Sequence, residues 1–259
     1  MLTKNNISKS LAPLEIDLLS YLEFKNQEIY TREELFDFIK DNKKTAYLIK
    51  KLLEKKRLLS LFKNTYLLVP VKAPQGLWSG NEYIIAKKLA RDSKYYIGFT
   101  SVFNSYGFTE QVSQMVYIVN NKYSGVKVIQ GIKYKLMKVT SKKMFGLEER
   151  IIHNEAVVFS SKERAMIDIF EFYKKNIKQA YAILRNQLAS LNIKTFIRNV
   201  VEYPTQITRR RIGYFLEQLK IEKKLLDTID VGKKGYSSLY GKISLSGKIN
   251  QRWRVIVNE

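Results

Sequence analysis

The side chains most often used in catalysis are scarce in this sequence. It contains no cysteine and one histidine, His153, which excludes thiol catalysis, disulfides, zinc ribbons and multi-histidine metal sites. Glu148 and Glu149 beside His153 come nearest to an acid–base cluster, but such a group is more often part of a surface loop. Phosphate-binding loops, dinucleotide-binding glycine motifs, nucleophile elbows and zinc-protease motifs do not occur in the sequence. We therefore predict a protein that is not an enzyme, with no catalytic residues, metal or cofactor.

The binding of polyanions is the chemistry that the composition favours. The chain of 259 residues has 46 Lys and Arg against 24 Asp and Glu, a net charge of +22. Such a surplus attracts nucleic acids first and anionic membranes second. A uniformly lysine-rich proteome is the alternative explanation. DNA or RNA is the leading predicted partner.

The densest basic stretch spans residues 40–63, with nine basic and two acidic side chains. In a helix over residues 43–56, its lysines lie opposite an apolar face of Ala46, Ile49, Leu52 and Leu53. Lysines on such a face contact phosphates, and a phosphate can also bind at the helix N-terminus. Neighbouring polar side chains would contact bases, and a Lys-Asn hairpin tip would reach the flanking backbone. The predicted DNA-binding residues are Asn42, Lys43, Lys44, Thr45, Tyr47, Lys50, Lys51, Lys63 and Asn64.

Local signals place this stretch in a helical unit of residues 1–70. Pro13 suits the first turn of a helix over 12–24, and Thr31 with Glu34 has the spacing of a capping box for a second helix ending near Lys40. Asp41-Asn42 makes a turn and an N-cap before the third helix. Strands over 58–62 and 65–69 are joined by Lys63-Asn64. This order is typical of a winged helix-turn-helix.

The pattern of residues in the remaining chain predicts a linker and a larger domain. Two prolines and two glycines fall in or beside a linker over residues 71–80, and residues 81–259 alternate helical and strand-like segments. We predict an α+β protein: an N-terminal winged helix-turn-helix plus a mixed α/β domain. Residues beyond 75 carry net +17. The expected elements are helices over 83–90, 100–106, 177–191 and 208–220, a helix capped by Ser160-Ser161 with support from Glu163, and strands over 94–97, 115–119, 126–139, 155–159 and 253–257.

A second basic cluster, Arg209, Arg210 and Arg211, begins one of these helices. Three arginines in a first turn oppose the helix dipole, so a bound phosphate or an acidic partner would explain them. Pairing with local carboxylates such as Glu202 and Glu217 is the alternative.

Three segments resemble the AbiEi-type antitoxins of type IV toxin–antitoxin systems. They are YYIGFTSVFNSYGF at 95–108 with TEQV and QMVYIV behind it, SSKERAMIDIFE at 160–171, and RRRIGYFLEQL at 209–219. The second segment contains Arg164 and Asp168 four residues apart, which at a helix surface would form an ion pair contributing about 0.2–0.5 kcal/mol.

The resemblance implies a transcriptional autorepressor that binds inverted repeats in its own promoter as double-stranded DNA. It also implies that the C-terminal domain counteracts a nucleotidyltransferase-like toxin, directly or indirectly. The alternative is a binder of structured, tRNA-like RNA through the C-terminal domain, where tyrosines could stack on bases. Apolar runs such as Tyr66–Val69 are far shorter than the roughly 20 residues of a membrane helix, and no signal peptide is apparent. We expect a cytoplasmic protein with no membrane partner.

Overall fold

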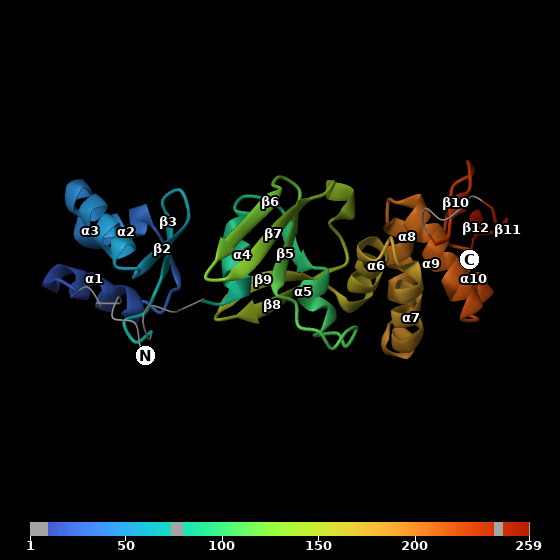
Figure 1. Ribbon diagram of the computed structural model, residues 1–259, viewed down its shortest axis with the longest axis horizontal. Coiled ribbons are helices and arrows are strands. Elements are labelled where there is room, and N and C mark those ends of the chain that lie inside the picture. Colours follow the sequence, from blue (N-terminus) through green and yellow to red (C-terminus); the bar gives the residue numbers. More distant parts are fainter. Residues whose placement is uncertain (1–9, 74–79, 241–245, 259) are drawn as a thin grey trace, which may run out of the picture. The chain divides into compact units, whose positions relative to one another are not determined.

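The computed structural model describes residues 10–73, 80–240 and 246–258 (Figure 1). It is a mixed α+β structure with several sheets, which confirms the predicted class. The chain forms two compact units. Unit 1 contains residues up to Arg91 together with Lys127–Lys133, and unit 2 contains Asp92–Val126 and the chain from Tyr134 onward. The first unit therefore extends past residue 70, and most of the predicted linker lies outside the described residues.

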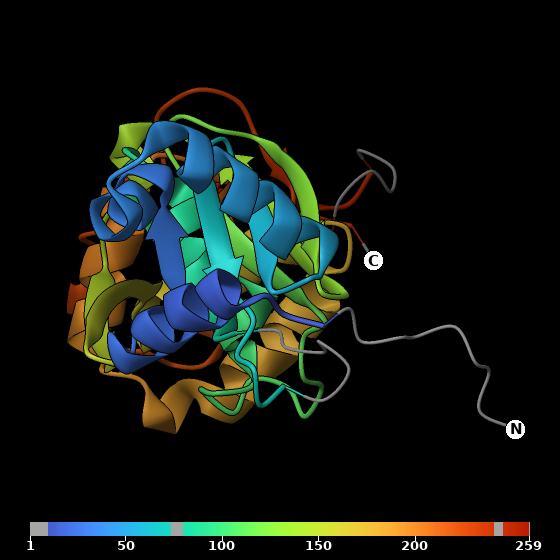
Figure 2. The same ribbon diagram turned by 90° about the vertical axis from the view of Figure 1, so that its left-hand side faces the viewer.

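Unit 1 begins with three helices and a small sheet. The helices are α1 (Pro13–Phe24), α2 (Arg32–Ile39) and α3 (Asn42–Glu54); the strands are β1 (Ile29–Thr31), β2 (Leu58–Phe62) and β3 (Thr65–Leu68). The antiparallel sheet has the order β1-β3-β2. In Figures 1 and 2 the three blue helices lie on one side of this sheet. A further helix, α4 (Glu82–Ala90), belongs to the same unit.

Short-range hydrogen bonds set the starts of α2 and α3. Thr31 and Glu34 form the predicted capping box, in which each side chain accepts from the other residue's backbone N–H. Asp41 caps α3 by accepting from the N–H of Lys44 at 2.9 Å. Lys40, in the left-handed region with φ 55°, makes the sharp turn between the two helices. The core beneath them contains Leu18, Leu19, Leu22, Tyr30, Leu35, Leu48, Ile49, Leu52, Leu58, Tyr66 and Leu68.

Unit 2 is organised around the larger sheet, whose strand order is β6-β7-β5-β4-β9-β8. Its strands are β4 (Tyr95–Gly98), β5 (Met115–Asn120), β6 (Gly125–Ile129), β7 (Ile132–Lys138), β8 (Leu147–Ile152) and β9 (Glu155–Ser160), with α5 (Thr100–Phe103) after β4. Strand β4 pairs antiparallel with β5 and parallel with β9. The tip of the β6–β7 hairpin is the segment that groups with unit 1.

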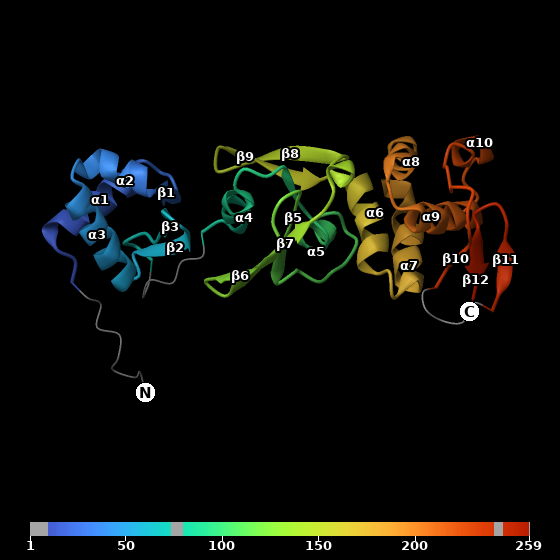
Figure 3. The same cartoon turned by 90° about the horizontal axis from the view of Figure 1, so that it is seen from above.

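Helices follow the sheet along the chain. They are α6 (Lys162–Phe172), α7 (Ile177–Gln187), α8 (Ile193–Glu202), α9 (Gln206–Gln218) and α10 (Lys223–Leu226), with 3-10 turns at Ser141–Lys143 and Leu188–Ser190. A last sheet, of order β10-β12-β11, joins β10 (Ser237–Ser238), β11 (Lys248–Asn250) and β12 (Val255–Val257). Figure 3 shows α6 between the larger sheet and the other helices, with α9 next to the small sheet.

Arg164 and Asp168 of α6 form a buried ion pair, and the expectation of a surface pair is wrong. The side chains are 1% exposed, and both Nε and Nη2 of Arg164 donate to Asp168 Oδ1 at 3.1 Å. The guanidinium also donates to the Tyr96 hydroxyl and to the carbonyls of Lys143 and Phe145. Burial opposes its charge, but Asp168 raises the pKa of Arg164, which therefore stays protonated. This pair ties the helices of unit 2 to its sheet.

Within the described residues, none of the helices combines the length and the apolar character that crossing a membrane requires.

We expect Asp168→Asn to destabilise the protein by about 3–5 kcal/mol, because it leaves the buried Arg164 charge without its counter-ion. Urea unfolding followed by circular dichroism measures the change. The exposed Asp17→Asn is the control, with an expected effect within about 0.5 kcal/mol. If Asp168→Asn changes stability no more than this control does, the pair does not hold unit 2 together.

Candidate nucleic-acid interface

The rotation of α3 about its axis differs from the sequence prediction by about one residue. Its buried residues are Thr45, Leu48, Ile49 and Leu52, whereas Ala46 is exposed. Thr45 can occupy the inner face because its hydroxyl donates to the Asp41 carbonyl at 2.7 Å, which satisfies the polar group inside the helix. Thr45 is fully buried, so the prediction that it contacts bases is not supported by its position.

The outward face of α3 consists of Asn42, Lys43, Ala46, Tyr47 and Lys50, all exposed. The last four residues follow Asn42 by one, four, five and eight positions, and residues at this spacing lie along one side of a helix. The Tyr47 side chain is 59% exposed although it is a large aromatic ring. Lys44 is exposed beside the stripe. We call these six residues the α3 face.

The basic side chains near the α3 face divide into paired and unpaired groups. Lys40 pairs with Asp37, Lys51 with Glu54, and Lys55 with Glu15, while Arg57 donates to the Pro70 carbonyl. The remaining lysines form no ion pair with any carboxylate in the part of the chain that the structure describes. They are Lys43, Lys44, Lys50, Lys56 and Lys63. Three of these belong to the α3 face, where their charge is available to an external anion.

Lys51 lies at the side of this face. Its Nζ is 3.3 Å from Glu54 and 5.7 Å from the centre of the Tyr47 ring. An exposed ion pair of this kind contributes little and exchanges readily for a phosphate. Lys56, which is not among the predicted DNA-binding residues, is exposed after the end of α3 and adds a further cation. Its only signal was membership of the basic stretch.

The N-terminus of α3 is less suited to a phosphate than predicted. The Asp41 carboxylate already accepts from the N–H of Lys44, and its negative charge stands at the positive end of the helix. An anion on the helix axis would be repelled by this carboxylate. Phosphate binding by α3 therefore depends on its lysine side chains.

The β2–β3 hairpin has the predicted two-residue tip, Lys63-Asn64, with Asn64 in the left-handed region at φ 58°. The Asn64 carbonyl accepts from the N–H of Arg32 at 2.9 Å, which ties the tip to the start of α2. Lys63 is exposed and Asn64 is partly buried. The hairpin is thus short, and Lys63 is its main side chain available to contact a ligand.

Arg210 and Arg211 are buried, so they do not form an exposed clamp for the backbone of a nucleic acid, which was one of the two interpretations of this cluster. Arg210 donates to the carbonyls of Val231 and Lys234 and to the Ser237 hydroxyl. Arg211 donates to the Ser238 carbonyl, and Arg209 lies 4.0 Å from Asp230. Neither Glu202 nor Glu217 is their partner. The cluster connects α9 to the last part of the chain.

The Glu148, Glu149 and His153 group does not converge on one site. Glu148 accepts from the Tyr106 hydroxyl and from Arg150, while His153 is exposed in the turn between β8 and β9. In the described ranges no three His, Asp or Glu side chains come together as metal ligands. The absence of catalytic residues stays a prediction.

Comparison with known proteins concerns the fold. The chain is similar to the crystal structure of the RV2827C protein from Mycobacterium tuberculosis, with a TM-score of 0.65 and 12% identity, over 96% of this chain and 93% of that one. Likeness at this identity extends to the fold alone. No protein-family model and no curated protein matches the sequence.

The Glu15–Lys55 pair, which joins α1 to the end of α3, makes the free energy of unfolding depend on pH. The carboxylate accepts from Lys55 Nζ at 2.5 Å and from the N–H of Ala12 at 2.7 Å. Burial raises the pKa of Glu15, but these hydrogen bonds outweigh it and the pKa is lowered. A carboxylate whose pKa is lowered by folding stabilises the folded state at a pH above its unfolded-state pKa of about 4.3. This stabilisation is lost as the pH falls through the pKa of the folded state.

We therefore expect Glu15→Gln to destabilise the protein at pH 7 by about 1–3 kcal/mol, and the difference from wild type to shrink between about pH 5 and pH 3. Thermal unfolding across this range measures it. A difference that is constant with pH would mean that the charge of Glu15 does not stabilise the position of α3.

Proposed function

We propose that the protein is a DNA-binding transcriptional autorepressor and antitoxin, in which unit 1 acts as a winged helix-turn-helix. The observation that carries the proposal is the α3 face: a stripe of exposed polar and basic side chains with unpaired lysines, on a helix whose opposite side is anchored in the core.

The order of elements supports this assignment. A helix, a short strand, two helices separated by a tight turn, and a hairpin that completes a β1-β3-β2 sheet are the parts of a winged helix-turn-helix. In this motif the second helix of the pair enters the major groove. That helix is α3, whose 13 residues span roughly 20 Å.

The α3 face divides into groups with different tasks. Lys43, Lys44 and Lys50 would neutralise phosphates and supply affinity by releasing counter-ions. Asn42 and Tyr47 have the hydrogen-bonding groups that contact base edges, and an amide such as that of Asn42 pairs well with adenine. Ala46, at the centre, has a side chain small enough to let the helix approach the groove floor.

The regulatory and antitoxin parts of the proposal rest on the resemblance of the three segments to AbiEi-type antitoxins. Unit 1 would bind inverted repeats in the chain's own promoter, and unit 2 would counteract a nucleotidyltransferase-like toxin. Much of the positive charge in the second and third segments lies in buried arginines. These three arginines, Arg164, Arg210 and Arg211, are therefore not available on the surface to contact an RNA backbone.

We expect the triple variant Lys43→Ala, Lys44→Ala, Lys50→Ala to lose binding to a duplex of the chain's own promoter at about 150 mM salt. Each lost phosphate contact should also reduce the slope of log affinity against log salt by about 0.9. Fluorescence anisotropy over a salt series measures both quantities.

The control for this variant removes the same charge from exposed positions of unit 2: Lys223→Ala, Lys224→Ala, Lys248→Ala. It should retain wild-type affinity and slope. Equal losses in the two triple variants would show that net charge alone drives binding, and unchanged affinity in the α3 variant would exclude α3 from it. Preferential, α3-independent binding of tRNA would favour the RNA-binding alternative.

For the antitoxin activity, we expect the adjacent reading frame to encode a nucleotidyltransferase-like protein that arrests growth when expressed alone. Co-expression of the wild-type chain should restore growth. The triple α3 variant should restore it equally well when both genes are driven by unrelated promoters, because toxin neutralisation is assigned to unit 2. Failure of the wild-type chain to restore growth would contradict the antitoxin role while leaving DNA binding intact.

A further inference from the structure

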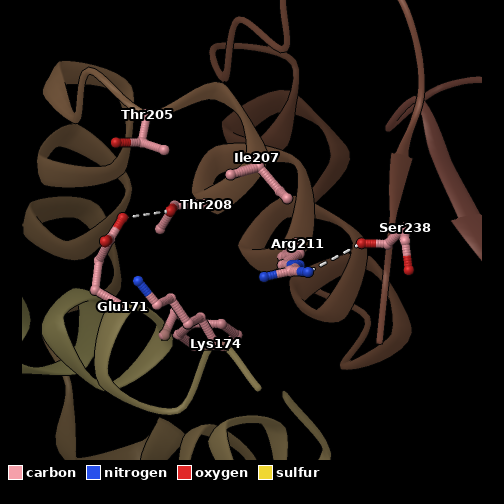
Figure 4. Close-up of a pocket in the computed structure, with 8 residues that line it drawn as sticks. Glu171, Lys174, Thr205, Ile207, Thr208, Arg211 and Ser238 are labelled. Carbon is pink, nitrogen blue, oxygen red and sulfur yellow. Dashed lines mark hydrogen bonds between the residues drawn. The ribbon is translucent and has the colours of Figure 1, made fainter. Parts of the chain in front are cut away.

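Unit 2 contains a pocket at the start of α9. Its volume is about 420 Å³, and Figure 4 shows the labelled side chains that surround it. It is lined by Phe170, Glu171, Lys174, Thr205, Ile207, Thr208, Arg211 and Ser238. A volume of this size is within the range of about 300–1,000 Å³ usual for small-molecule sites.

Arg211 differs from the other deeply buried arginines in how few of its donors are used. A guanidinium has five N–H donors. Arg164 directs its donors to a carboxylate, a hydroxyl and two carbonyls, and Arg210 has three acceptors. Arg211 is only 6% exposed. With the described residues it makes a single hydrogen bond, from Nη2 to the Ser238 carbonyl at 3.0 Å, and its Nε finds no partner among them.

The charge of Arg211 is likewise unmatched. Among the described residues no carboxylate lies within ion-pair distance of it. Glu171 lines the same pocket, but Figure 4 shows it on the opposite side, where it accepts from the Thr208 hydroxyl at 2.8 Å. Lys143 also lies 3.8 Å from Glu171. Burial lowers the pKa of Arg211, and the negative charge of Glu171 across the pocket offsets this only in part.

The start of α9 adds donors to the same space. Thr205, the N-cap, makes no side-chain cap, and the first turn has no acidic residue of its own, although the Glu171 carboxylate of α6 accepts from the Thr208 hydroxyl there. The N–H groups of Gln206 and Ile207 have no acceptor in the part of the chain that the structure describes. Such an N-terminus attracts anions through its free N–H groups and its dipole. Lys174, exposed at the rim, brings a second cation.

We propose that this pocket binds a small phosphate monoester of about mononucleotide size. The phosphate would lie between Arg211, Lys174 and the first turn of α9. Phe170 and Ile207 provide apolar surface for the organic part, and Glu171 can accept from a hydroxyl of the ligand. The inference uses no residue of α3 and goes beyond the proposed function.

Two sources share this chemistry: free nucleoside monophosphates and the terminal phosphate of an oligonucleotide. Because Arg211 is buried, internal phosphates of a duplex cannot reach it, and we commit to the free small molecule.

Thermal unfolding of the full chain tests the site with inorganic phosphate, the four ribonucleoside monophosphates, and sodium chloride at matched ionic strength. At 100 times the dissociation constant, a bound ligand should raise Tm by about 5–10 °C. At least one monophosphate should act at lower concentration than inorganic phosphate. Stabilisation no greater than that by sodium chloride would overturn the proposal.

Variants locate the effect. Arg211→Met keeps the apolar packing and removes the unmatched charge, so the ligand-free protein should remain folded while ligand affinity falls at least 100-fold. Lys174→Ala should weaken binding about 10-fold, whereas the neighbouring exposed Lys175→Ala, outside the pocket, should not. Ligand-induced shifts that are identical in wild type, Arg211→Met and Lys174→Ala would overturn the assignment.

Oligonucleotides distinguish the two sources. Equal binding of 5′-phosphorylated and 5′-hydroxyl oligonucleotides supports the free monophosphate as ligand. An Arg211-dependent preference for the phosphorylated form, without any effect of the monophosphates, would overturn the choice of a small molecule.

Discussion

The outward face of α3 depends on how unit 1 holds this helix. Thr45, Leu48, Ile49 and Leu52 fix one side of the helix in the core, and Asp41 caps its start. The Glu15–Lys55 pair connects its end to α1. A helix packed into a core is held in one orientation about its own axis. These contacts therefore determine which residues of α3 face outward. The exposure of the α3 face is therefore a consequence of packing.

Charge has opposite roles in the two units. In unit 1 the lysines of the α3 face are exposed and form no ion pair with any carboxylate that the structure describes, so their charge is available to a ligand. In unit 2 several arginines lie inside the fold, where Arg164 and Arg210 are satisfied by carboxylate, hydroxyl and carbonyl groups. Arg211 is the exception: one hydrogen bond, to the Ser238 carbonyl, is found for it among the described residues, and it lines a pocket. A single net charge for the chain conceals this division.

Features set by neighbouring residues could be predicted from the sequence. The Thr31–Glu34 capping box, the Asp41 cap and the Lys63-Asn64 turn need only contacts between residues a few positions apart. Strand β1 was missed, since three residues show no measurable alternation and its partner β3 lies over thirty positions later. Glu163 was expected to support a cap but accepts from the distant N–H of Asn192.

The candidate site could be predicted in its composition but not in its details. The rotation of α3 was misjudged because hydropathy favours burying Ala46 over Thr45, whereas a hydroxyl that bonds to the backbone one turn earlier can be buried easily. The burial of Arg210 and Arg211 in α9 cannot be predicted locally, because their acceptors belong to residues 230–238, which only the tertiary fold brings near. Whether a cation is exposed depends on such long-range partners.

Lysine acetylation followed by mass spectrometry, with and without a duplex of the chain's own promoter, measures whether DNA covers the α3 face. We expect DNA to protect Lys43, Lys44 and Lys50 from modification, while Lys223 and Lys224 in unit 2 react equally in both states. Unchanged reactivity of the three α3 lysines at saturating DNA would contradict it.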